Sequence, residues 1–206
     1  MATSDSPGFD HNGFYHRFLL RQVPPGCDRA LDVGCGSGLF ARRLADHAGS
    51  VEAIDRAPEM IAQARMLSSG IRNVRYLEAD LADHALGRAR YDYIACIAGL
   101  HHMPFTETIT KLRAALAPGG VLAIVGCYRQ ASPADYAPDL IAIPANLIAN
   151  AVVRARARDG RATAPIMDPR LTLPEIRQRT RRLLPGAVIR RRLFWRYTLI
   201  YRRPAG

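Results

Sequence analysis

The sequence predicts a doubly wound α/β fold, in which helices cover both faces of a mostly parallel sheet. An apolar run at 30–33 predicts a short buried strand, and apolar residues recur at helical spacing over 39–45. Between them, glycines at 34, 36 and 38 form a turn that few side chains would allow. Further apolar strands alternate with helical patterns as far as residue 127. This alternation is typical of parallel strands joined by crossover helices, and it brings the glycine turn to the carboxyl end of the sheet.

The elements expected from periodicity follow one another with clear breaks. Pro24-Pro25-Gly26 ends the first helix, and Pro58 opens a later helix at a first-turn position that suits proline. Ser37 is placed to cap the helix that follows the glycine turn. We expect helices at 9–23, 39–48, 58–67, 105–116 and 173–184, and strands at 30–33, 51–55, 73–78, 91–98, 121–127, 188–193 and 194–201.

The length of 206 residues predicts a single domain with an elaboration near its C-terminus. Residues 1–8 predict a disordered tail. Residues 132–185 interrupt the alternation, and their apolar first half predicts one or two helices kinked at Pro144. Alternating side chains over 187–203 predict a terminal hairpin.

The positive charge is concentrated in the last quarter of the chain. The formal net charge is +11, and from Arg154 onward fifteen arginines stand against three acidic residues. Such clusters attract phosphate groups, so nucleic acid stays open as a partner. Lys111 is the only lysine, a bias that indicates GC-rich codon usage more than selection for guanidinium chemistry at each position.

The composition argues against several classes of protein. Cys27, Cys35, Cys96 and Cys127 form no C-x-x-C pair, so we expect reduced structural cysteines in a reducing compartment. No cluster of His, Cys, Asp or Glu has metal-ligand spacing, so we expect no metal. The chain does not begin with a basic, apolar leader, and the apolar stretch at 140–153 is too short to span a bilayer. We therefore expect a soluble, cytoplasmic protein.

Acidic residues end two of the predicted strands. Asp55 follows Gly38 by 17 residues, and Asp80 closes the next strand with Leu81 beside it. In a doubly wound fold, an acid about 20 residues beyond the glycine turn binds ribose hydroxyls. The glycine spacing is G-x-G-x-G, which differs from the dinucleotide pattern G-x-G-x-x-G, and no G-K-[ST] follows to make a P-loop.

These residues closely resemble the class I S-adenosylmethionine-dependent methyltransferases, in particular the small-molecule enzymes of methyltransferase type 11. The sequence LDVGCGSG at 31–38 is similar to the first motif of that family, and residues 116–122 are similar to its turn and fifth strand. Asp55 matches the acid that binds ribose, and the pair Asp80-Leu81 matches the residues that contact adenine. The resemblance implies a Rossmann-like sheet of seven mostly parallel strands, with an antiparallel C-terminal hairpin and a helical insertion before it.

The resemblance implies a site for S-adenosylmethionine at the carboxyl end of the sheet, with S-adenosylhomocysteine as the product. The N-terminal helix is expected to pack across the cofactor mouth, and the insertion is expected to form a lid over the acceptor pocket. Asp32 is expected to orient the glycine turn through backbone amides. The implied cofactor-binding residues are Asp32, Gly34, Cys35, Gly36, Gly38, Asp55, Arg56, Met60, Asp80, Leu81, Ile97, Ala98, Tyr15 and His16.

Two histidines follow the fourth predicted strand, where the family places its active-site loop. His101 and His102 are the candidate catalytic residues, because a neutral imidazole can take a proton from an acceptor near neutral pH. The alternative is that they order the loop by hydrogen bonding.

Other candidate site residues also have a structural alternative. Asp55 and Asp80 could cap the helices that follow them. Tyr15 and His16 could be packing or surface residues.

The predicted function is methyl transfer to a small, apolar or aromatic acceptor, because an apolar insertion would line its pocket. One alternative is an RNA methyltransferase that uses the basic C-terminal quarter, although the stripe of Trp195, Tyr197 and Tyr201 favours sheet packing over base stacking. Another is a membrane-surface-associated methyltransferase of a lipid-like acceptor, since Arg154 and Arg156 follow an apolar segment as in an interfacial anchor. The acceptor, the methylated atom and the oligomeric state are left open by the sequence.

Overall fold

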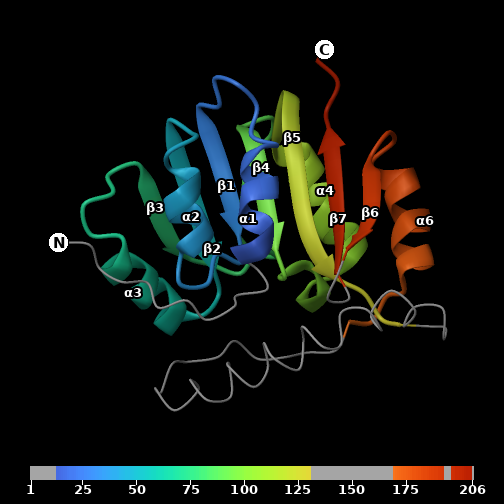
Figure 1. Ribbon diagram of the computed structural model, residues 1–206, viewed down its shortest axis with the longest axis horizontal. Helices are drawn as coiled ribbons and strands as arrows, with labels where there is room; N and C mark the ends of the chain where they lie inside the picture. Colours follow the sequence, from blue (N-terminus) through green and yellow to red (C-terminus); the bar gives the residue numbers. More distant parts are fainter. Residues whose placement is uncertain (1–12, 131–168, 193–195, 206) are drawn as a thin grey trace.

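A twisted sheet of seven strands forms the centre of the protein (Figure 1). The computed structural model describes residues 13–130, 169–192 and 196–205. The strand order is β3-β2-β1-β4-β5-β7-β6, in which β1 to β5 are parallel and β7 runs antiparallel to both β5 and β6. This order confirms the expected α/β fold class, including the antiparallel pair at one edge of the sheet.

Most helices and strands begin and end close to the positions expected from periodicity, although the strand expected at 121–127 already begins at Leu116. They are α1 (Gly13–Leu20), β1 (Arg29–Val33), α2 (Leu39–Leu44), β2 (Ser50–Asp55), α3 (Pro58–Leu67), β3 (Val74–Glu78), β4 (Tyr91–Ile97), the 3₁₀ helix η1 (Leu100–His102), α4 (Phe105–Ala115), β5 (Leu116–Cys127), α6 (Leu173–Leu183), β6 (Val188–Arg192) and β7 (Arg196–Arg202). The expected tail at 1–8, the first residues of the 9–23 helix and the expected kinked helices around Pro144 lie outside the described residues.

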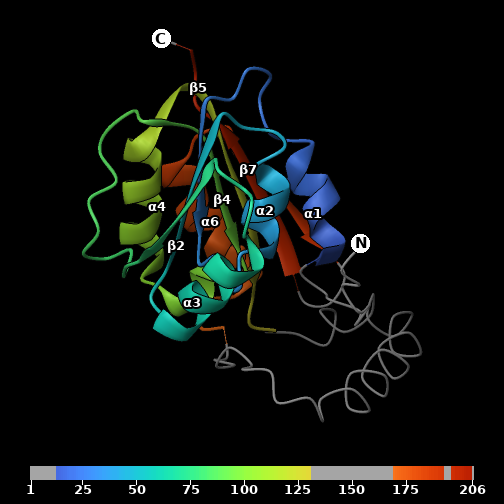
Figure 2. The same cartoon turned by 90° about the vertical axis from the view of Figure 1, so that its left-hand side faces the viewer.

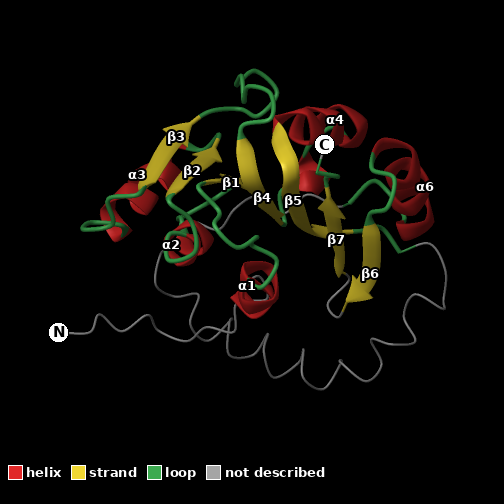
Figure 3. Ribbon diagram, turned by 90° about the horizontal axis from the view of Figure 1, so that it is seen from above, coloured by secondary structure: helices red, strands yellow, loops and turns green. Residues whose placement is uncertain are grey.

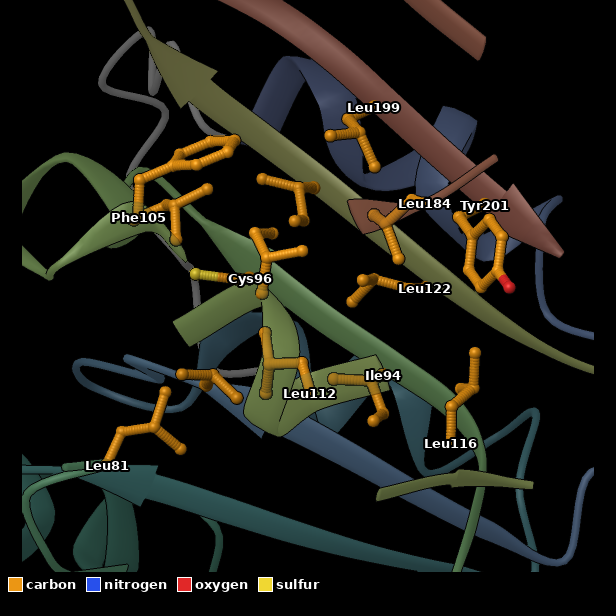
Figure 4. Packing of buried hydrophobic residues seen from close by; sticks show 14 of the residues in the cluster. Leu81, Ile94, Cys96, Phe105, Leu112, Leu116, Leu122, Leu184, Leu199 and Tyr201 are labelled. Carbon is orange, nitrogen blue, oxygen red and sulfur yellow. The ribbon is translucent and has the colours of Figure 1, made fainter. Parts of the chain in front are cut away.

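Helices cover the two faces of the sheet, with α1, α2 and α3 on one face and α4 and α6 on the other (Figures 2 and 3). Each face has its own core of buried side chains. Leu19 of α1, Phe40 of α2 and Ile61 of α3 belong to the first core. Leu112 of α4 and Ile176 of α6 belong to the second, part of which Figure 4 shows. Because both faces are covered, the central strands are apolar on both sides and carry few polar groups except at their ends.

The terminal strand β7 belongs to the second core. Tyr197 and Tyr201 are buried there, which supports sheet packing for this part of the aromatic stripe, while Trp195 lies outside the described residues. The helix α6 begins with a capping box, in which the Thr172 amide and hydroxyl both donate to the Glu175 carboxylate at 2.8 and 2.7 Å. Within the described ranges, no helix has the length and apolar character needed to cross a bilayer.

The helix after the glycine turn differs from expectation at both ends. Ser37 does not cap it: the N-cap is Gly38, which has a φ of 75° and makes no side-chain hydrogen bond. A Cβ at Gly38 would lie 2.5 Å from the Tyr76 hydroxyl, so glycine is required for close packing as well as for the backbone angle. The helix ends at Leu44 rather than at residue 48, and the Asn73 side chain donates to the carbonyls of Ala45 and Ala48 beyond this end.

Candidate functional site

A cavity of about 980 Å³ lies at the carboxyl ends of β1, β2 and β4. In the sheet, β1 lies between β2 and β4. The connections that follow these neighbouring strands therefore run to opposite sides of β1, and a crevice opens between them. The lining comes from the glycine turn after β1, the end of β2, the segment after β3, the segment after β4 and the start of α4. Residues far apart in the sequence therefore share one site.

The glycine turn presents bare backbone to this cavity. The amides of Gly34 and Cys35 donate to the Ile54 carbonyl at 2.8 and 3.0 Å, which ties the turn to β2. Gly36 has a φ of 52°, and a Cβ there would lie 3.5 Å from the Met60 methyl group. With no side chain at Gly34 or Gly36, a ligand can approach the main chain directly.

Asp55 has a fixed orientation at the end of β2. Its Oδ2 accepts a hydrogen bond from the Gly36 amide at 2.8 Å, and its Oδ1 accepts one from the Ala57 amide at 3.0 Å. Ala57 is the N-cap of α3, so Asp55 does contribute to the start of that helix. An ionised carboxylate has about four acceptor positions, so two remain for hydroxyl groups of a ligand in the cavity that Asp55 lines.

Asp32 lies in β1 below the turn and is 1% exposed. Its carboxyl group accepts a hydrogen bond from the Ala41 amide, and its Oδ2 has no hydrogen-bond partner among the described residues. The expectation that Asp32 orients the glycine turn is therefore corrected, because the amide that it contacts belongs to α2 and Asp55 holds the turn. Burial, followed by the nearby Asp55 charge, raises the pKa of Asp32 to about 7.

Asp80 and Leu81 follow β3 and line the other end of the cavity. Asp80 Oδ1 accepts a hydrogen bond from the Ala82 amide at 2.8 Å, which shapes a turn rather than the helix that a capping role would need. The Lys111 ammonium group, from α4, donates to the carbonyls of Leu81 and Ala82. This lysine thereby ties the backbone of the segment after β3 to α4.

The two histidines of η1 have different surroundings, although their ring centroids are 3.9 Å apart. His102 lines the large cavity, whereas His101 lines a second, smaller one. Burial lowers the pKa of His101 to about 4, with His102 and Arg196 adding to the effect. Burial and the Arg56 charge also lower the pKa of His102. Both rings are therefore neutral at pH 7, and one of them lines the large cavity.

Helix α1 contributes one residue to the cavity lining. His16 lines it, and its ring packs edge-on against Phe40 with a centroid distance of 5.0 Å. Arg43 donates to His16 Nδ1 at 2.9 Å, because a guanidinium group can only donate. Tyr15 is buried in the core under α1 and does not line the cavity, so its assignment to the cofactor site is not supported by its position.

Most of the residues expected at the cofactor site come together in this cavity. Those that line it are Asp32, Gly34, Cys35, Gly36, Asp55, Arg56, Met60, Asp80, Leu81, Ile97, Ala98, His16 and His102. Gly38, Tyr15 and His101 do not: Gly38 lies under Tyr76, Tyr15 faces the core, and His101 faces the second cavity.

The sequence analysis missed the residues that α4 and the loop before it add to the cavity. Met103, Pro104, Glu107, Thr108 and Lys111 all line it. On α4, the side chains that pack in the core and the side chains that line the cavity occupy neighbouring helical positions. Periodicity alone therefore does not distinguish a core residue from a cavity residue on this helix. Lys111 did carry a signal, because it is a single lysine in a chain that otherwise uses arginine.

A family model and curated relatives that match this chain are all described as methyltransferases. Residues 30–120 match the model of the family described as "Methyltransferase domain". The chain is 36% identical over 204 residues to an uncharacterized methyltransferase of Mycobacterium tuberculosis strain H37Rv, covering 97% of this chain and 99% of that protein. It is 40% identical over 111 residues to a ubiquinone biosynthesis O-methyltransferase of Xylella fastidiosa strain 9a5c, covering 51% of this chain and 44% of that protein.

A solved structure shows the same fold. The DhpI–SAH complex has a TM-score of 0.63 and 22% sequence identity, covering 92% of this chain and 81% of that chain. The chain thus belongs to the class I S-adenosylmethionine-dependent methyltransferases. It is an enzyme whose methyl donor is S-adenosylmethionine.

The residues of the cavity fit this cofactor. Its ribose hydroxyls and adenine amine need acceptors, and Asp55 and Asp80 both line the cavity. Its amino-acid end carries an ammonium group and a carboxylate. These groups suit the bare backbone of the glycine turn and the buried carboxyl group of Asp32, whose Oδ2 has no hydrogen-bond partner among the described residues. Among the described residues, no group of three or more His, Cys, Asp or Glu could hold a metal ion.

Replacing Lys111 with methionine should weaken the binding of S-adenosylhomocysteine by roughly tenfold, the scale of a lost charge-assisted hydrogen bond. The reason is that the Leu81–Ala82 backbone would lose its two hydrogen bonds from α4. Isothermal titration calorimetry measures the affinity. Arg113→Met is the matched control, because Arg113 is also on α4 and donates to a backbone carbonyl, that of Leu183, away from the cavity. Equal affinities in the two variants would remove the positioning role of Lys111.

Replacing Asp32 with asparagine should make the stability of the cofactor-free protein fall less between pH 5 and pH 8. The pKa of Asp32 is about 7 in the folded chain and about 3.9 in an unfolded one, so the folded chain retains the proton longer. The contribution of Asp32 to stability is then fully present below pH 4 and is lost as the pH rises through 7. The stability gained by Asp32→Asn should grow by roughly 2 kcal/mol between pH 5 and pH 8. Urea denaturation at both pH values measures it, and a pH-independent difference would contradict the explanation.

Proposed function

We propose that this enzyme transfers a methyl group to a small acceptor with an apolar or aromatic body, which binds near His102. The observation that carries the proposal is that the large cavity continues beyond the glycine turn to His102, Met103 and Pro104. Its volume of about 980 Å³ is at the upper end of ordinary ligand pockets, which supports room for an acceptor beside the cofactor.

The character of the lining supports an apolar acceptor. Phe40, Met60, Ile97 and Met103 surround the part of the cavity between α2, α3 and η1. Methionine side chains adapt to flat, polarizable ligands at low cost, which suits an aromatic ring. The relative in Xylella fastidiosa is named a ubiquinone biosynthesis O-methyltransferase, and it matches half of this chain, so methylation at oxygen is the first reaction to test.

S-adenosylmethionine supplies an electrophilic methyl group: the acceptor lone pair forms the new bond while the carbon–sulfur bond breaks and its electron pair stays on sulfur. In our proposal Asp55 binds the ribose, Asp80 and the Leu81 amide bind the adenine, and Asp32 and the Gly34 carbonyl hold the ammonium group. Much of the rate enhancement then comes from alignment, since these contacts fix the donor at one end of the cavity.

His102 is the proposed general base. Its neutral form is favoured at pH 7 because burial and the Arg56 charge lower its pKa. A neutral imidazole beside the acceptor can take the proton that a hydroxyl group loses as its oxygen forms the new bond. His101 is left out of this role, since it faces the second cavity.

The RNA alternative has one supporting observation, the basic composition of the C-terminal quarter. Within the described residues 169–192 and 196–205, Glu175 is the only acidic residue among many arginines. These arginines belong mainly to α6 and β6, at the edge of the sheet away from β2 and β3 (Figure 1). The alternative of a membrane-surface enzyme depends on residues 140–158, which lie outside the described residues.

A transfer assay with labelled S-adenosylmethionine tests the proposed function. We expect methylation of neutral or anionic phenols and of apolar hydroxyl compounds, and no methylation of transfer RNA at low or moderate salt. Asp55→Ala should lower transfer to every acceptor, because it removes both the proposed ribose contact and the Gly36 hydrogen bond that holds the turn. Methylation of transfer RNA alone, lost at high salt, would replace this proposal with the RNA alternative.

Replacing His102 with glutamine should lower the rate of transfer to a hydroxyl acceptor by roughly 100-fold, the lower range for a lost general base. The wild-type rate should fall on the acid side with a midpoint below about 6.5, the ordinary histidine value, because the pKa of His102 is lowered. The variant should lose this acid limb. His47→Gln serves as the control, because His47 is exposed and does not line the cavity. An acid limb that persists unchanged in His102→Gln would assign the base to another group.

A further inference from the structure

A second cavity, of about 450 Å³, lies on the other side of the loop that carries the histidines. Its walls come from η1, the start of α4, the ends of β5 and β7, the segment before α6, and α6 itself. His102, Met103 and Pro104 line both cavities, so the second cavity adjoins the proposed point of methyl transfer.

The floor of the second cavity is apolar. Leu100, Phe105, Ile176 and Tyr197 line it, and all four are buried in the second core. His101 adds a ring that burial keeps neutral, with its pKa lowered to about 4. The base of the second cavity is therefore apolar, and its charged groups lie among the other lining residues.

The charged residues of the second cavity have one sign. Arg170 and Arg179 line it, and no Asp or Glu belongs to its described lining. The nearest acid on the same helix, Glu175, accepts hydrogen bonds from the Thr172 amide and hydroxyl, which lower its pKa first, and the Arg129 and Arg179 charges lower it further. A third guanidinium group is close, since Arg196 donates to the Cys127 thiol and Cys127 also lines the cavity.

We propose that the second cavity binds the anionic end of the acceptor, so that the substrate class is an apolar or aromatic body carrying a carboxylate or similar anionic group. The inference rests on the proposed function, because the shared His102–Pro104 wall is what connects anion binding to methyl transfer. A planar guanidinium group matches a carboxylate with two parallel hydrogen bonds. Two such groups, with no acid among the described lining residues and an apolar floor below them, suit a ligand that is apolar at one end and anionic at the other.

The test compares matched charged and neutral probes on the protein loaded with S-adenosylhomocysteine. Benzoate and benzamide form the aromatic pair, and decanoate and decanol form the aliphatic pair. We expect each anion to bind more tightly than its neutral partner, and we expect the better of the two anions to identify the acceptor body. Arg170→Gln/Arg179→Gln should weaken anion binding by roughly tenfold or more, and should leave the neutral probes unchanged.

The matched control is Arg177→Gln/Arg181→Gln, which removes the same charge from exposed positions of α6 that do not line the cavity. Equal losses in both double variants would reduce the effect to general charge attraction and overturn the inference. Anions that bind no better than their neutral partners would also overturn it.

The inference and the proposed function fail in distinguishable ways. If a neutral phenol is methylated equally well by the wild-type enzyme and by Arg170→Gln/Arg179→Gln, and no anion binds, the proposed function stands and the inference is lost. If no small acceptor of either charge is methylated while S-adenosylhomocysteine still binds, the proposed function is lost, and the probe titrations alone decide whether the second cavity binds anions.

Discussion

The hydrogen bond from the Gly36 amide to the Asp55 carboxylate is the contact on which the geometry of the site depends. At 2.8 Å it joins the turn after β1 to the end of β2. The amides of Gly34 and Cys35 reinforce the junction through the Ile54 carbonyl. The same contact therefore orients an acid toward the cavity and keeps the turn in a conformation that only glycine adopts easily, since φ at Gly36 is 52°.

The loop after β4 divides the space above the sheet into two parts. In η1, successive residues point in different directions, so His102 reaches the large cavity and His101 reaches the smaller one. In the large cavity acidic lining residues outnumber the basic ones, which are Arg56 and Lys111, whereas the charged residues that line the smaller cavity are Arg170 and Arg179. In our two proposals, the methyl donor and the anionic end of the acceptor therefore bind on the two sides of this short segment.

The α/β fold class could be predicted because the strand and helix periodicities are strong and the glycine turn lies between the first strand and the first core helix. The residues expected at the cofactor site came instead from the resemblance of these motifs to a known family. The failures concern details that the sequence does not encode locally. Gly38 looks like its neighbours but is fixed by Tyr76, a residue 38 positions away. The separation of His101 from His102 depends on the rotation of a 3₁₀ helix, and the contribution of Lys111 depends on how α4 packs against the segment after β3.

The strand β6 ends the sheet with three consecutive arginines, Arg190 to Arg192. Neighbouring side chains of a strand point to opposite faces, and here Arg191 lies over the Tyr128 ring while Arg192 lies over the Phe18 ring. Two molecules that approached edge to edge along β6 would bring these like charges together. Their repulsion opposes the joining of two sheets into one, so this outer strand can keep open backbone groups without inviting aggregation.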